Sequence, residues 1–115
     1  MNVEIRATEL KLTVRQRADA AARVRAAFAR LAHRVSRVVV DLRGAGAHKS
    51  RRCAVEVHIP GEAPVLVEDR HVNVAALVRR ALARAWRAAI ARVAALAARR
   101  PIHHLPAPVR QAPWK

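Results

Sequence analysis

The chain has 115 residues, 53% of them hydrophobic and 3% aromatic, which indicates one small domain with a core of short aliphatic side chains rather than ring clusters. Its formal net charge of +15 favours polyanionic partners, chiefly nucleic acid or an anionic membrane surface. No apolar run approaches the ~20 residues of a membrane span, and the single cysteine, Cys53, excludes an intrachain disulfide.

The first two elements are predicted from their periodicity. Residues 1 to 7 alternate apolar and polar, with Val3 and Ile5 on one side, which is typical of a half-buried strand. Thr13 can cap a helix that runs to about Ala32. The apolar stripe of this helix is predicted to comprise Val14, Ala21, Val24, Phe28 and Leu31.

Three strands follow the first helix. Their inward faces are predicted to carry Val38, Val40 and Leu42 in the first, Cys53, Val55, Val57 and Ile59 in the second, and Val65 and Val67 in the third. The segment GAGAHKSRR (residues 44 to 52) is predicted to be a flexible basic hairpin loop, and Pro60 and Gly61 mark the next turn.

A long helix is predicted from about Val72 to Arg100, where Pro101 ends it. Its buried side is predicted to comprise Val74, Leu77, Val78, Ala81, Leu82, Ala85, Ala89, Val93 and Leu96. Arg80, Arg84 and Arg87 fall within about 60° of one another, opposite that side. Residues 101 to 115 contain four prolines and no periodicity, so we expect a domain over residues 1 to 100 and a mobile basic tail after it.

The element order predicts an α+β fold, β-α-β-β-β-α, in which two helices cover one face of a four-stranded sheet. The other face would hold charges of both signs, able to pair across strands. No acidic residue follows Asp69. We therefore expect a positive helical side, in a protein that is a monomer.

Catalytic and metal motifs are weak in this sequence. GAGAHKS has His48 where a phosphate-binding loop needs a glycine before its lysine, and it joins two strands rather than opening a helix. The six histidines show no metal-ligand spacing, and no serine or cysteine has an evident base. We expect no enzyme activity, no cofactor and no metal. The opening residues lack the apolar block of a signal peptide, and one cysteine suits a reducing cytosol.

Two passages resemble the ribosome hibernation-promoting factor family, also called ribosome-associated inhibitor A or ribosomal subunit interface protein. They are MNVEIRATELKLT at the start and HIPG…EDRHVNVAALVRRAL before and into the last helix. With the element order, the resemblance covers residues 1 to about 100. His71 stands where the family usually has an aromatic residue, and arginines replace its lysines.

The resemblance implies a protein that lies in the decoding channel of the small ribosomal subunit, competes with messenger and transfer RNA, and silences translation in the cytoplasm. A chain this short would not pair ribosomes unaided. By position, the residues implied to contact ribosomal RNA are Lys49, Arg51, Arg52, Arg79, Arg80, Arg84 and Arg87.

Two other functions stay open at this stage. One is a generic binder of structured RNA, because a sheet backed by two helices also resembles the double-stranded-RNA-binding class in outline. The other is an interaction protein or a membrane-surface binder. The last helix argues against membrane binding, because its apolar side is needed to cover the sheet.

Overall fold

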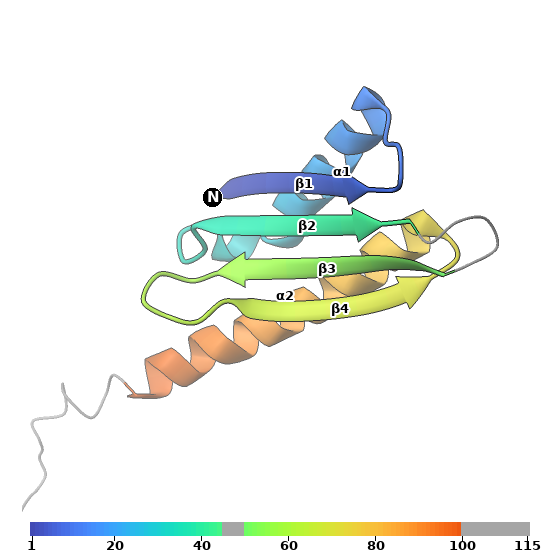
Figure 1. Cartoon of the computed structure of the whole chain (residues 1–115). Coiled ribbons are helices and arrows are strands. Elements are labelled where there is room, and N and C mark those ends of the chain that lie inside the picture. The colour runs from blue at the N-terminus through green and yellow to red at the C-terminus, as the bar shows by residue number, and fades with distance from the viewer. Residues whose placement is uncertain (45–49, 100–115) are drawn as a thin grey trace, which may run out of the picture.

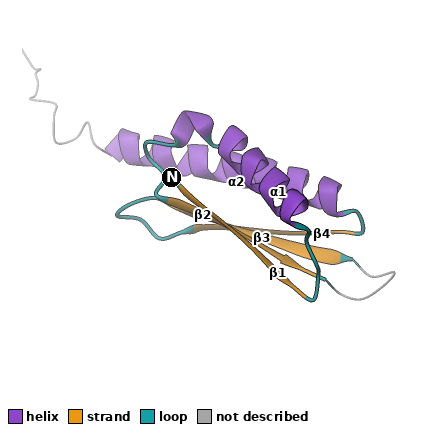
Figure 2. Ribbon diagram, turned by 90° about the horizontal axis from the view of Figure 1, so that it is seen from above, coloured by secondary structure: helices purple, strands orange, loops and turns teal. Residues whose placement is uncertain are grey.

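The computed structural model describes residues 1–44 and 50–99. The elements are β1 (Asn2–Thr8), α1 (Val14–Ala27), the 3-10 turn η1 (Ala29–Leu31), β2 (Arg37–Arg43), β3 (Arg51–His58), β4 (Val65–His71) and α2 (Val74–Arg99). Both helices lie on one face of the sheet (Figures 1 and 2). The predicted α+β fold and element order are confirmed. Lys49 and the predicted tail lie outside the described residues, so the boundary near residue 100 stays a prediction.

The sheet has the order β1-β2-β3-β4, so strands that follow one another in the chain also lie side by side. β1 runs parallel to β2, because α1 carries the chain back across the sheet between them, and the other two pairings are antiparallel hairpins. The core lies between sheet and helices. Its fully buried members include Val40, Val55 and Leu77.

Each helix begins at a side-chain cap. The Thr13 hydroxyl accepts a hydrogen bond from the Gln16 amide (3.0 Å), and the Gln16 side chain accepts one from the Thr13 amide (2.9 Å), which together form a capping box. At the start of α2, the Asn73 side chain accepts from the Ala76 amide (2.9 Å). His71 Nδ1 accepts from the Asn73 amide (2.9 Å), so this histidine fixes the entry to α2.

Three details of the sequence prediction were wrong. The first helix ends at Ala27 rather than Ala32, because the chain tightens into the 3-10 turn after Phe28. Val14 is 88% exposed, since it occupies the first helical position beyond the edge of the core. β3 begins at Arg51, so Arg51 and Arg52 belong to a strand rather than to the predicted loop.

Gly44 ends β2 at a position with no room for a side chain. Its amide donates to the Thr8 carbonyl (2.9 Å), and a Cβ atom there would lie 2.0 Å from the Glu9 carbonyl oxygen. Any other residue would push β2 away from the turn after β1. Gly44 therefore holds the ends of these two strands together, at the end of the sheet where Arg43 lies.

Candidate nucleic-acid interface

The helical layer carries a large excess of positive charge. Helices α1 and α2 contain ten arginines, and Asp19 is their only acidic residue. Helix surfaces that serve solubility alone usually mix both signs and pair them three or four residues apart. With one carboxylate for ten arginines, this layer can pair few of its charges in that way, and its composition therefore suits contact with a polyanion.

Two arginines of α2, Arg79 and Arg87, have no partner among the described residues. Both are exposed, and in the part of the chain that the structure describes neither makes a side-chain hydrogen bond or ion pair. Arg79 and Arg23 of α1 both line a shallow groove between the helices. The groove is lined by Arg23, Ala26, Ala27, Arg79, Leu82, Ala83 and Trp86.

Arg80 and Arg84 are instead held at the edge strand β4. An Arg80 Nη2 atom lies 3.3 Å from Asp69 Oδ1, and Arg84 Nη1 donates to the Glu68 carbonyl oxygen at 2.8 Å. Arg84 also lies 3.8 Å from Asp69 Oδ2, which is an ion-pair distance but too long for a hydrogen bond. Spacing along the helix could not reveal this acidic partner, because Asp69 comes from the neighbouring strand β4.

Arg51 and Arg52 point to opposite faces of the sheet, as successive residues of a strand must. Arg51 Nη1 donates to the Val72 carbonyl oxygen (2.7 Å), so its side chain ties β3 to the chain that enters α2. Arg52 is exposed on the face that the helices leave open. The structure therefore does not bring the two arginines and the α2 arginines onto one surface.

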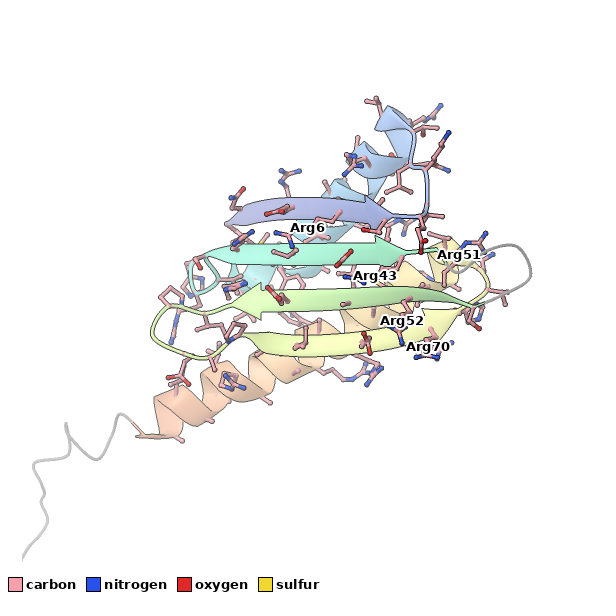
Figure 3. The ribbon with its side chains drawn as sticks, in the orientation of Figure 1. Arg6, Arg43, Arg51, Arg52 and Arg70 are labelled. Atoms are coloured by element: carbon pink, nitrogen blue, oxygen red, sulfur yellow. The ribbon has the colours of Figure 1, made fainter. Side chains whose placement is uncertain are left out.

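The open face of the sheet pairs most of its charges across and along strands, as predicted. Glu4 accepts from Arg6 and Arg37, both at 2.5 Å, and these guanidinium groups, Arg37 foremost, lower the pKa of the Glu4 carboxyl. His58 Nε2 lies 2.9 Å from the Glu56 carboxylate. One feature of this face was not predicted, a row at one end where Arg43, Arg52 and Arg70 lie side by side (Figure 3). Only the strand register reveals it.

Comparisons with known proteins find similar solved structures but no matching family model or curated protein. Among solved structures, the N-terminal domain of Protein Y from Thermus thermophilus aligns with 75% of this chain and 92% of its own, at 29% identity and a TM-score of 0.58. A ribosomal subunit interface protein from Coxiella burnetii aligns with 81% of this chain and 99% of its own, at 8% identity and a TM-score of 0.63. The predicted family resemblance is confirmed.

Other kinds of site find little support in the described part of the chain. Residues 1–44 and 50–99 contain no cluster of three histidine, cysteine or acidic side chains that could hold a metal ion. Over the same residues, no helix is both long enough and apolar enough to span a membrane.

Cys53 is a core residue, as its inward position in the predicted strand indicates, and its side chain is fully buried between sheet and helices. Burial raises the pKa of the Cys53 thiol to about 12, and the negative charges of Asp69 and Asp41 add to the shift. Because only the thiolate reacts, we expect the native protein to resist maleimide labelling at pH 8. In denaturant the same thiol should label fully, and rapid labelling of the native protein would contradict this burial.

Proposed function

We propose that this protein binds ribosomal RNA in the decoding channel of the small ribosomal subunit and blocks translation by occupying that channel. The main observation behind this proposal is that the two helices carry ten arginines and one carboxylate. They lie on a fold shared with a ribosomal subunit interface protein. The proposed action is steric and needs no catalytic group or cofactor. It takes place in the cytoplasm, where ribosomes work, and uses a single copy of the chain.

The α2 arginines are proposed to contact RNA phosphates in two different ways. Arg80 and Arg84 are held by β4, so their guanidinium groups lose little conformational freedom when an RNA strand arrives. Arg79 and Arg87 are free to adapt, and each can offer a planar pair of N–H donors to a phosphate. Together the two sets follow α2 for about two turns, which suits a stretch of RNA backbone.

Three other residues remain predicted to bind RNA, and they differ in where they lie. Lys49 lies outside the described residues. Arg51 keeps donors beyond the one that bonds Val72, so it can still reach RNA near the start of α2. Arg52 lies on the open face, away from the helical layer, and its role there is considered below.

The test is co-sedimentation with purified small ribosomal subunits at near-physiological salt, with and without transfer RNA bound in the channel. We expect saturation at one copy per subunit and loss of binding when transfer RNA is present. Binding of many copies, insensitive to transfer RNA and abolished by modest salt, would overturn the decoding-channel proposal. That result would instead support a generic binder of structured RNA.

A further inference from the structure

Three arginines form a row across three neighbouring strands on the open face of the sheet. In the strand register Arg43 pairs with Arg52, and Arg52 pairs with Arg70. All three are exposed, and they lie at the same end of the sheet (Figure 3). Since neighbouring strands are about 4.8 Å apart, the backbone positions of the row span about 10 Å.

The chain's own carboxylates leave this row largely unneutralised. Arg43 lies 3.5 Å from Asp41, whereas within residues 1–44 and 50–99 the Arg52 and Arg70 side chains have no hydrogen-bond or ion-pair partner. Glu68 shares the face and the strand of Arg70, yet the two form no ion pair. Residues 45–49 and 100–115 contain no aspartate or glutamate.

Like charges directly opposite each other destabilise a sheet, so the chain alone gives no stabilising reason for this row. An external anion would supply one. Three guanidinium groups in a line present several planar pairs of donors, which match the oxygens of successive phosphates along a strand.

The surroundings of the row favour a nucleic acid over a protein partner. Next to it lie Thr8, which continues the row on β1, and then the charged neighbours Arg6, Asp41 and Glu68. Leu66, an exposed large apolar side chain of this face, lies two side-chain rows away from Arg70, and a single exposed valine, Val72, follows the end of β4. A protein interface needs a desolvated apolar centre, and this end of the sheet does not provide one.

We propose that Arg43, Arg52 and Arg70 form a second phosphate-binding surface, which contacts RNA on the side of the domain opposite the helices. The inference rests on the proposed function and deepens it. The domain would lie between two RNA segments, with α2 against one backbone and the end of the sheet against the other. Contacts on both faces would fix its orientation, which a single cationic face cannot do.

The test is the double variant R52Q/R70Q, assayed for binding to purified small ribosomal subunits over a range of salt concentrations. We expect binding about tenfold weaker at 0.15 M salt. The slope of log affinity against log salt should fall by about 1.4 to 1.8, since each lost phosphate contact removes about 0.7 to 0.9. The matched control is R6Q/R37Q, which removes the same charge from the same face. Its arginines already pair with Glu4, so its affinity should stay within about twofold of the wild-type value.

The outcomes separate this inference from the proposed function. If the wild-type chain fails to bind subunits, the proposed function itself fails. If the wild-type chain binds and R52Q/R70Q binds equally well with the same salt slope, the arginine row is overturned and the decoding-channel proposal stands. Weaker binding with an unchanged salt slope would show that the lost contacts are not contacts to phosphates, and would also overturn the row. The thermal midpoint of R52Q/R70Q should equal or exceed that of the wild type, so that lost affinity cannot come from unfolding.

Discussion

Changing Arg79 and Arg87 to glutamine should weaken binding to small ribosomal subunits by at least tenfold at 0.15 M salt without changing the stability of the fold. Both side chains are exposed, and neither has a partner among the described residues, so their loss removes charge from the surface but no hydrogen bond or ion pair that the structure shows. With two phosphate contacts gone, the salt slope should fall by about 1.4 to 1.8. Titrations at several salt concentrations, with urea unfolding in parallel, measure both quantities.

Changes at Arg80 and Arg84, the two arginines held by β4, should lower stability as well as affinity. Adding R80Q and R84Q to the first two changes should bring the loss of affinity to about a hundredfold or more, because four contacts are then missing. It should also lower stability, since Asp69, whose side chain is only 11% exposed, loses both of its cations. R6Q/R37Q again serves as a control for net charge. Wild-type affinity and salt slope in R79Q/R87Q would show that RNA does not contact the outer surface of α2.

The sequence predicts the elements of this fold well because each has one buried side. The alternation of apolar and polar residues identifies the inward face of a strand. In β2 it predicts Val38, Val40 and Leu42 for that face, and all three are buried. The 3.6-residue period marks the core side of α2 in the same way. Its residues Leu77, Ala81 and Ala85 are fully buried. These patterns depend only on local geometry, so one sequence is enough to find them.

The cationic sites were less predictable because they depend on contacts between elements. The pairing of Arg80 with Asp69 joins positions eleven residues apart, outside the spacing that governs pairs within a helix. The row of Arg43, Arg52 and Arg70 requires the register of three strands. A shift of one residue would turn its members to the other face. Assigning Arg52 to a loop hid that register.

The aromatic content shows a further difference. The sequence predicts a core without ring clusters, and most of the core is aliphatic, as predicted. One ring pair does occur, where Phe28 meets Trp86 edge to face with centroids 5.9 Å apart and planes at 74°. Trp86 was absent from the predicted buried side, yet it is half-buried and packs on the core. This pair joins the end of α1 to the middle of α2.

Changing Phe28 to alanine should therefore lower the free energy of unfolding by about 3–5 kcal/mol, the usual loss when a buried phenylalanine is truncated. Phe28 is fully buried, ends α1, and holds the two helices in register through Trp86. Small domains have only about 5–15 kcal/mol in total, so the variant should be partly unfolded near body temperature. Urea unfolding followed by circular dichroism measures the loss.

Phe28→Leu is the matched control for this prediction, because it keeps most of the buried volume and removes the ring contact. It should cost well under half as much as Phe28→Ala. The comparison also bears on function, since Arg23 and Arg79 face each other across a groove whose width depends on how α1 packs against α2. The leucine variant should stay folded with its helical arginines slightly displaced, so its affinity for subunits should fall less than that of R79Q/R87Q. A loss below about 1.5 kcal/mol for Phe28→Ala would show that the helices are held together without this ring.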